Sequence, residues 1–474
     1  MRATRQPRIP TSLVNAAETT MATLDVDHQT AATWVHAGAL AQHAAQTGLA
    51  PAGLPTRAAL DTIATRHESL EHWGKLAAAI PATAEHKIDA LWLEHPLTDP
   101  ADAPALWYSY PLGDLYQGLS TEAVKGRAFC QTPWWVGELL LHISYDRAIE
   151  HWDDPRVIDP SCGAGHLLVE SYLAARSART LAGRWNDPMA CLNQVHGVDL
   201  DPHAAATAAY RLTTLAYAES WTGPQNNRRR TTDGLPDAPI HVAAANSLLA
   251  ESEPLLGRGR YHVVVANPPY ITVKDPEMNA AVRARYPETT HRRYSLALPF
   301  HQLMMKLLVP GGWCAQLTAN SFAKREFGTK YVQNWLSHLD AQWIIDTSGA
   351  YIPGHGTPTV IMCHRNQLPT SDTVRVIQGI QGEPSAPAEP SEGLVWSAIR
   401  DQVYARESTE RHQRRYEAET AAHLAPRAKT SEPTFELIAP PSQAQGLPGP
   451  KRPKQRKPKP APKNQPELIH VEAA

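Results

Sequence analysis

Residues 263–273 read VVVANPPYITV, an apolar run rich in valine that ends at an asparagine, two prolines and a tyrosine. Proline has no amide hydrogen to offer a sheet, so the pattern predicts a buried strand that ends at Asn267. Other short apolar runs lie between about 120 and 366, separated by segments with helical apolar spacing. This alternation predicts an α/β fold with a mostly parallel, doubly wound, Rossmann-like sheet of seven strands. Ligands of such sheets bind at the C-terminal strand ends, where the polar residues of these runs stand.

The composition narrows the class of protein. The chain has 474 residues and a formal net charge of −2, so any affinity for nucleic acid must come from local basic patches. Five cysteines without a CxxC pair favour a reducing compartment, and the absence of HExxH argues against a metal site. The N-terminus has no apolar leader and the chain has no run of about 18 apolar residues, so we expect a soluble cytoplasmic protein without a membrane partner.

Changes in pattern divide the chain into four predicted parts. Residues 1–115 hold alanine-rich windows with helical spacing and Pro/Gly stops, which predict a mainly helical region. Residues 116–367 carry the α/β pattern, and residues 368–440 are less regular and are expected to form an auxiliary region. Residues 441–474 combine proline with basic residues, which predicts a disordered basic tail. The tail is expected either to add sequence-blind DNA affinity or to act as a solubilising linker.

The segment DPSCGAGH, residues 159–166, has the order strand, glycine-rich loop, helix. A dinucleotide fingerprint requires a third glycine where Leu168 stands, and the Gly-Lys-Ser/Thr of a phosphate-binding loop is absent. Gly163 and Gly165 therefore suit the close approach of a smaller zwitterionic group, and Asp159 can accept a hydrogen bond from an ammonium. A bare strand-to-helix turn without a ligand is the alternative at this point.

The next two runs add polar residues at their C-terminal ends. Asp199 is placed to hold two ribose hydroxyls, although a helix N-cap is an alternative role for it. Leu200 can cover a purine face, and Asn246 after the third run can pair with an adenine edge. The glycine-rich loop, the acid that can hold a ribose and the asparagine that can pair with adenine follow one another along the chain. This is the order expected for a site that binds S-adenosylmethionine (SAM).

The Asn-Pro-Pro-Tyr tetrapeptide predicts chemistry on an amino group. An exocyclic amino group is a poor nucleophile because its lone pair is delocalised into the ring. The side-chain oxygen of Asn267 and the carbonyl of Pro268 can accept its two N–H groups and free the lone pair to attack a sulfonium methyl. The fixed φ of Pro268 and Pro269 keeps that carbonyl in place, and Tyr270 offers a stacking face for a base turned out of its helix.

At this point the chain resembles the N6-adenine-specific DNA methyltransferases with an Asn-Pro-Pro-Tyr motif, over residues 120–366. The loop DPSCGAG, the acid of GVDLDP and NPPY stand in that family's order, and QTPWW before the loop is similar to its Thr-Pro element in the gamma-type arrangement. The resemblance implies a SAM contact for Thr132 and a second stacking aromatic, for which Tyr351 is the candidate. It implies DNA methylation in restriction-modification or phage defence, on double-stranded DNA with a flipped adenine.

A narrower resemblance is to the methyltransferase component of phage-growth-limitation (BREX-type) defence systems, carried by DTSGAYIPGHGTPTVIM at 346–362 and VRVIQGIQGEPS at 374–385. Many relatives have aspartate where Asn246 stands, which leaves its adenine contact open. Relatives also carry a long C-terminal region that reads the DNA target, whereas about a hundred residues follow the α/β pattern here. Target recognition is therefore expected to be weak, absent, or supplied by a partner protein.

Two alternatives remain open from the sequence. The same tetrapeptide serves enzymes that methylate cytosine N4, rRNA guanine or a protein glutamine, and a non-catalytic DNA-binding subunit is a third class. The Thr-Pro element and a long insertion after the tetrapeptide favour DNA. That insertion carries four arginines that can meet a phosphate backbone, or form a solvated loop: Arg283, Arg285, Arg292 and Arg293.

Overall fold

The computed structural model describes residues 9–97, 105–120, 130–184, 187–220, 239–323, 326–354, 356–371, 373–378 and 382–408. Residues Met1–Val403 form one compact unit, and Tyr404–Ala474 form a second unit of which only residues 404–408 are described. The predicted basic tail and residues 409–440 of the predicted auxiliary region therefore lie outside the described residues. Within the described part, no helix is long and apolar enough to cross a membrane.

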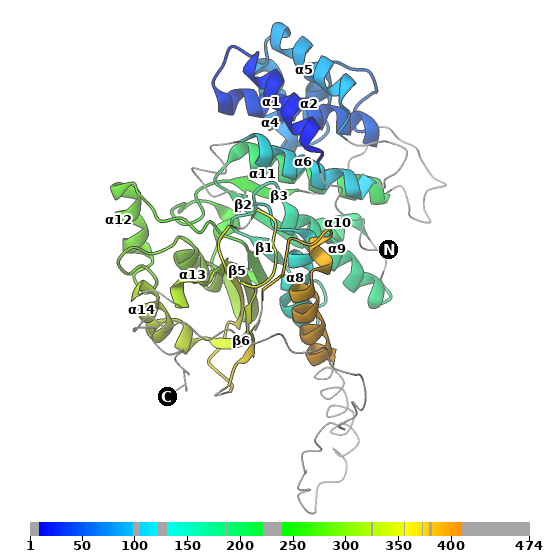
Figure 1. The fold of residues 1–474 in the computed structure, drawn as a ribbon. Helices are drawn as coiled ribbons and strands as arrows, with labels where there is room; N and C mark the ends of the chain where they lie inside the picture. Colours follow the sequence, from blue (N-terminus) through cyan, green and yellow to red (C-terminus); the bar gives the residue numbers. More distant parts are fainter. Residues whose placement is uncertain are drawn as a thin grey trace, which may run out of the picture. The chain divides into compact units, whose positions relative to one another are not determined.

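A single mixed sheet organises the first unit (Figure 1). Its strand order is β3-β2-β1-β4-β5-β7-β6-β8. The first five strands in this order run parallel to one another, and β7 is antiparallel to both of its neighbours. The seven predicted strands all form, and an eighth short strand pairs in parallel with β6 at the edge. The strands are β1 (Val157–Asp159), β2 (Val195–Asp199), β3 (His241–Ala244), β4 (Tyr261–Ala266), β5 (Leu308–Ala319), β6 (Asp340–Asp346), β7 (Thr359–Arg365) and β8 (Arg375–Ile377).

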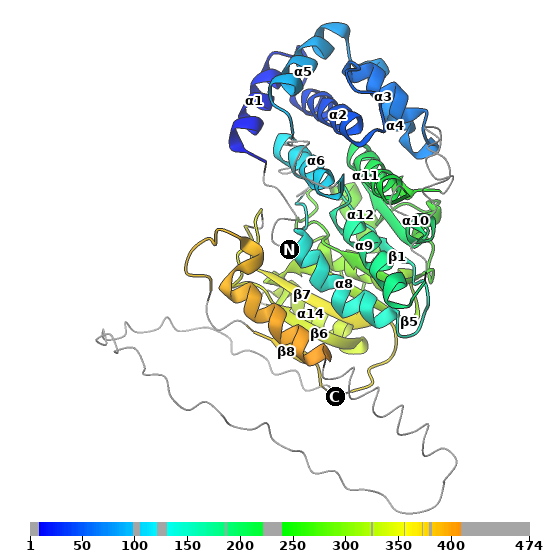
Figure 2. The same ribbon diagram turned by 90° about the vertical axis from the view of Figure 1, so that its right-hand side faces the viewer.

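Helices cover both faces of this sheet, which explains why β4 is apolar along almost its whole length (Figures 1 and 2). Val263 and Val265 belong to the core under α8, α9 and α11, whereas Val264 and Ala266 belong to the core under α12 and α13. The helices are α8 (Trp134–Ala148), α9 (His166–Leu181), α10 (Pro188–Leu192), α11 (Pro202–Ser220), α12 (Pro276–Arg285), α13 (Ala297–Leu307) and α14 (Glu326–Asn334).

The N-terminal part is helical and has a hydrophobic core of its own. Asp27 caps its longest helix by accepting a hydrogen bond from the amide of Thr30, and Gly48 ends that helix in the left-handed conformation. Ala206 and Tyr210 of α11 complete this core, so α11 packs against both parts of the unit. The helices are α1 (Thr11–Ala22), α2 (His28–Thr47), α3 (Thr56–Ala64), α4 (Glu71–Ala79), α5 (Ala82–Glu94) and α6 (Ala105–Leu119).

Short 3-10 turns connect several of these elements and a further helical stretch follows β8. That stretch covers residues 394–403 within the first unit, and its Trp396 packs edge-on against Trp135 of α8 with ring centroids 4.2 Å apart. The 3-10 turns are η1 (Glu68–Leu70), η2 (Pro254–Leu256), η3 (Asn320–Ala323), η4 (Leu336–His338) and η5 (Pro390–Glu392).

Candidate active site

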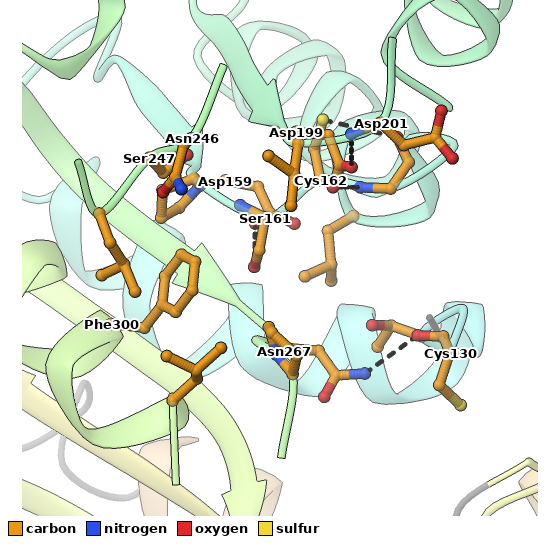
Figure 3. A pocket seen from close by; sticks show the side chains of 18 of the residues that line it. Cys130, Asp159, Ser161, Cys162, Asp199, Asp201, Asn246, Ser247, Asn267 and Phe300 are labelled. Atoms are coloured by element: carbon orange, nitrogen blue, oxygen red, sulfur yellow. Dashed lines mark hydrogen bonds between the residues drawn. The ribbon is translucent and has the colours of Figure 1, made fainter. Parts of the chain in front are cut away.

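One open pocket lies at the C-terminal ends of β1, β2 and β4 (Figure 3). It encloses about 860 Å³, including the part open to solvent. Parallel strands bring their carboxyl ends to the same edge of a sheet, which is why residues far apart in sequence meet here. Eight of the residues singled out from the sequence line it, namely Thr132, Asp159, Gly163, Asp199, Leu200, Asn246, Asn267 and Pro269.

The glycine-rich loop forms one wall of this pocket. Gly163 and Gly165 both have positive φ, 52° and 85°, a region that other residues rarely adopt. Gly165 does not line the pocket; it begins α9, and a Cβ added there would lie 3.0 Å from the Cα of Ala208. The loop glycines therefore serve close packing of α9 on α11 as well as the approach to a ligand.

Asp159 ends β1 and is only 2% exposed. Its Oδ1 accepts hydrogen bonds from the amide of Ser161 at 2.9 Å and from its hydroxyl at 3.3 Å. Burial raises the pKa of Asp159 to about 8, against the effect of the Ser161 hydrogen bonds and with a smaller contribution from Asp199. This carboxyl group is therefore mainly protonated at neutral pH, and a cation placed beside it would ionise it.

Asp199 and Asp201, at and just after the end of β2, have different hydrogen-bonding roles. Asp199 accepts hydrogen bonds from the amides of Gly163 and Asp201, each at 2.8 Å, and faces the pocket. Asp201 takes the capping role, because its Oδ1 accepts from the amide of His203 at 2.9 Å in the first turn of α11. The N-cap alternative for Asp199 is therefore wrong. Leu200 between them is 50% exposed at the pocket, where an apolar side chain can cover a flat ring.

Another wall of the pocket contains Phe300, a residue whose role the sequence did not reveal. Phe300 of α13 reaches into the pocket on the side of Asn246 and Ser247 (Figure 3). Phe300 has helical spacing with Leu303, Met304 and Leu307, which belong to the same buried core, and at 7% exposure it is largely buried. Helical periodicity identifies the buried face of a helix, but it cannot tell whether that face packs on a sheet or borders a cavity.

The Asn-Pro-Pro-Tyr segment follows β4, and both polar atoms of its asparagine side chain form hydrogen bonds. The amide nitrogen of Asn267 donates to the carbonyl oxygen of Cys130 at 3.3 Å (Figure 3). Its Oδ1 accepts from the hydroxyl of Tyr270 at 2.5 Å. Pro269 lines the pocket, whereas Pro268 is buried and Tyr270 is not among the lining residues. Burial raises the pKa of Tyr270 well above its usual value, so this hydroxyl stays a donor.

The four arginines after this segment differ in their surroundings. Arg283 donates to the backbone carbonyls of Thr290 and Arg292, and Arg285 donates to those of Leu249 and Ala250, so both guanidinium groups hold the insertion in place. Arg292 has a positive φ of 51°, and both it and Arg293 are exposed. None of the four lines the pocket, nor does Tyr351, which is 43% exposed.

The charge of the pocket distinguishes between classes of ligand. Its described lining includes three carboxyl groups, those of Asp159, Asp199 and Asp201, and neither lysine nor arginine. The remaining titratable base is His166, whose pKa burial lowers to about 4, so that it is neutral. Such a lining repels a pyrophosphate and suits a ligand that carries positive charge.

Comparison with known proteins agrees with this geometry. Residues 193–352 match the family model described as Eco57I restriction-modification methylase. The chain is also 38% identical over 366 residues to "Adenine-specific methyltransferase PglX" of Streptomyces coelicolor, a match that covers 66% of this chain and 29% of the relative. The resemblance to adenine-specific methyltransferases expected from the sequence is thus confirmed, while the chain spans less than a third of that relative's length.

The fold is shared with a solved methyltransferase subunit. The type I restriction-modification system methyltransferase subunit from Streptococcus thermophilus superposes with a TM-score of 0.52 at 14% identity, covering 84% of this chain and 93% of the other. At that identity the likeness concerns the fold alone. It supports the Rossmann-like, doubly wound architecture that the alternating strands and helices predicted.

Proposed function

We propose that this chain is a SAM-dependent methyltransferase that modifies the N6 amino group of adenine in DNA. One observation carries the proposal: the candidate catalytic amide of Asn267 and the acids Asp159 and Asp199 line the same pocket. An amino-group acceptor and a site for a cationic cofactor thus lie within one cavity, as direct methyl transfer requires. The adenine and DNA assignment draws support from the Eco57I-type match and from the name of the Streptomyces relative.

The residues of the pocket fit SAM. Its ammonium would lie near Asp159 and its ribose hydroxyls near Asp199, with Thr132 and Gly163 at the methionine end. Leu200 and Phe300 offer apolar surfaces on which an adenine ring can lie, and Asn246 stands beside Phe300. Bound SAM supplies a methyl group activated by a positively charged sulfur.

Asn267 and Pro268 would act on the acceptor. The Asn267 oxygen has a second lone pair besides the one used by Tyr270, and with the Pro268 carbonyl it can accept both N–H groups of an adenine amine. The bond to Cys130 engages the amide nitrogen as a donor, and the oxygen is the atom of this amide that can accept from the substrate. No strong base is needed, because the electrophile is already positively charged, and the released proton passes to solvent.

The DNA side of the proposal involves residues that do not line the pocket. We infer that duplex DNA with its adenine turned out is the substrate, with Tyr270 and Tyr351 as stacking candidates. Arg292 and Arg293 are exposed and suited to phosphate contacts, whereas Arg283 and Arg285 would act indirectly by holding the insertion. A partner protein that supplies sequence recognition belongs to the same proposal.

Nucleoside mass spectrometry tests this function directly. The purified chain is incubated with SAM and genomic DNA, and the same chain is expressed in cells with and without its genomic neighbours. We expect N6-methyladenine in wild-type samples and none with Asn267→Ala. N4-methylcytosine alone, or methyl label on RNA or protein instead of DNA, would refute the adenine assignment. Failure of the wild-type chain to bind SAM by calorimetry would refute the cofactor assignment.

A further inference from the structure

Helix α6 links the N-terminal helical core to the candidate SAM pocket. It lies between α2 and α11 and packs against both (Figures 1 and 2). Leu112, Leu115 and Leu119 of α6 belong to the N-terminal core, while Tyr110 belongs to the core under α8, α9 and α11. A helix shared by two cores has little freedom to shift, so side chains that project from it are fixed in position.

Three side chains of α6 each bind a different wall of the pocket. Asp114 Oδ1 lies 3.2 Å from Nε2 of His166, at the start of α9. The hydroxyl of Tyr116 donates to Oδ2 of Asp201 at 2.6 Å. The side-chain oxygen of Gln117 accepts from the amide of residue 131 at 2.6 Å, in the segment before α8.

Each wall residue bound by α6 lines the pocket, and two of them adjoin a proposed SAM residue. Asp201 follows Leu200 and Gln131 precedes Thr132, whereas His166 follows Gly165 at the end of the glycine-rich loop. The approach is also close, since a Cβ added to Gly113 of α6 would lie 2.4 Å from Cε1 of His166. These contacts join the loops after β1 and β2 to the Thr132 segment.

We propose that α6 is a positioning element for the SAM site, with Tyr116 and Gln117 as its positioning residues. This role of α6 rests on the proposed SAM site, and it means that the N-terminal helical part contributes to cofactor affinity. Tyr116 acts through Asp201, which caps α11 and donates its own amide to Asp199, the proposed ribose acid. Gln117 acts through the backbone of residue 131, which holds the neighbouring Thr132 at the pocket wall.

Tyr210 provides a matched control for Tyr116. Its side chain is also fully buried, and its hydroxyl bonds Nδ1 of His43 at 2.8 Å across the same packing of α11 on the N-terminal helices. It does not line the pocket and binds none of its walls. Tyr116→Phe and Tyr210→Phe each remove one buried hydroxyl, so both should destabilise the fold to a similar degree, but only the first loosens the pocket.

The experiment measures the SAM dissociation constant by calorimetry and the thermal unfolding midpoint of the full chain and its variants. We expect Tyr116→Phe to weaken SAM binding about tenfold, while Tyr210→Phe stays within about twofold of wild type. With substrate DNA, Tyr116→Phe should raise KM for SAM and leave kcat at saturating SAM nearly unchanged. Equal SAM affinity in Tyr116→Phe, Tyr210→Phe and wild type, with both variants destabilised, would show that α6 is merely structural.

Gln117 gives a second test, which can be carried out even if the Tyr116→Phe variant fails to fold. Gln117→Glu keeps an acceptor for the amide of residue 131, whereas Gln117→Met keeps the length but removes the acceptor. We expect near-wild-type SAM affinity for the first variant and a loss of about tenfold for the second. Equal affinities in the two variants would overturn the role of Gln117. A wild-type chain that binds no SAM contradicts the proposed function itself, and so the two failures are distinguishable.

Discussion

The hydroxyl of Tyr270 donates a hydrogen bond to the side-chain oxygen of Asn267, three residues earlier in the chain. Together with the bond from the Asn267 amide nitrogen to the carbonyl of Cys130, this contact fixes the orientation of the amide. The oxygen is the group that a substrate amine requires, because it accepts and does not compete as a donor. The tetrapeptide therefore helps to orient the amide proposed to be catalytic, in addition to rigidifying the carbonyl of Pro268.

The first prediction concerns the loss of this amide. Asn267→Ala removes one of the two acceptors for the amino group, and we expect methyl transfer to fall at least about 100-fold. SAM binding should stay within about threefold of wild type, because Asp159 and Asp199, the acids proposed to bind SAM, are unchanged. Tritiated-SAM transfer assays and calorimetry measure the two quantities. Retained activity would remove Asn267 from the catalytic role.

Asn267→Asp tests the orienting contact with Cys130. The carboxylate retains an acceptor for the substrate but cannot donate to the Cys130 carbonyl, and two oxygens then face each other. We expect kcat to fall about tenfold with little change in SAM affinity, a smaller loss than with Asn267→Ala. A kcat equal to that of wild type would show that the Cys130 contact is dispensable.

The second prediction concerns Asp199. Replacing Asp199 by alanine removes the proposed ribose acceptor and leaves the amides of Gly163 and Asp201 without their carboxylate partner. We expect SAM affinity to fall by more than about tenfold, as for the loss of a hydrogen bond to a charged group. Asp199→Asn serves as the comparison, since it retains an acceptor of similar shape. Unchanged affinity in the alanine variant would remove the ribose role.

Much of the sheet could be predicted because both of its faces are buried. Strands such as β4 are therefore continuous apolar runs that end sharply at polar residues, and these ends mark the pocket. Strand β8 gave no such signal, because it has only three residues and its Val376 is 60% exposed. A short edge strand is determined by pairing with its neighbour, which a local pattern does not contain.

The candidate site was only partly predictable for a related reason. Residues at the ends of strands follow from topology, so Asp159, Asp199 and Asn267 were expected to meet. Phe300 reaches the pocket through the tertiary placement of α13, and the partners of Arg283 and Arg285 are backbone carbonyls. No side-chain pattern in the sequence identifies a carbonyl partner. The contacts of α6 likewise depend on how two cores pack together.

The third prediction is a proton linkage at Asp159. With its pKa raised to about 8, this carboxyl is protonated in the SAM-free chain at pH 7 and must ionise to pair with an ammonium. SAM binding should therefore release protons at pH 7, and affinity should rise by up to about tenfold per pH unit between pH 6 and 8. Above about pH 8 it should rise no further, because the Asp159 carboxyl group is then already ionised in the SAM-free chain.

Calorimetry in buffers with different ionisation enthalpies counts the released protons. Asp159→Asn serves as the control, because it keeps the shape of the side chain but has no proton to release. We expect weaker binding with a much flatter pH dependence for this variant. Identical pH profiles for the wild type and Asp159→Asn would contradict the assignment of the ammonium to Asp159.

The last prediction concerns stability in acid. Burial lowers the pKa of His36 and His364 to about 4 and of His43 to about 3, and it places those of His203 and His301 well below the usual value. Each histidine stays neutral in the folded chain but takes up a proton near pH 6.5 when unfolded. The unfolded state thus binds more protons, and the free energy of unfolding should fall as pH decreases from 6.5 towards 4.

Urea unfolding at pH 7.5, 6.5, 5.5 and 5.0 measures this effect above the usual range of carboxylate titration. Asp159, with its raised pKa, contributes in the opposite direction within this window, but the histidines outnumber it. His43→Gln is an informative variant, since it removes one such histidine and keeps a polar group near the Tyr210 hydroxyl. We expect a lower stability at pH 7.5 for this variant and a smaller loss on going to pH 5.0. The same loss in variant and wild type would show that His43 does not contribute, and a flat profile for both would exclude the buried histidines as the cause of acid unfolding.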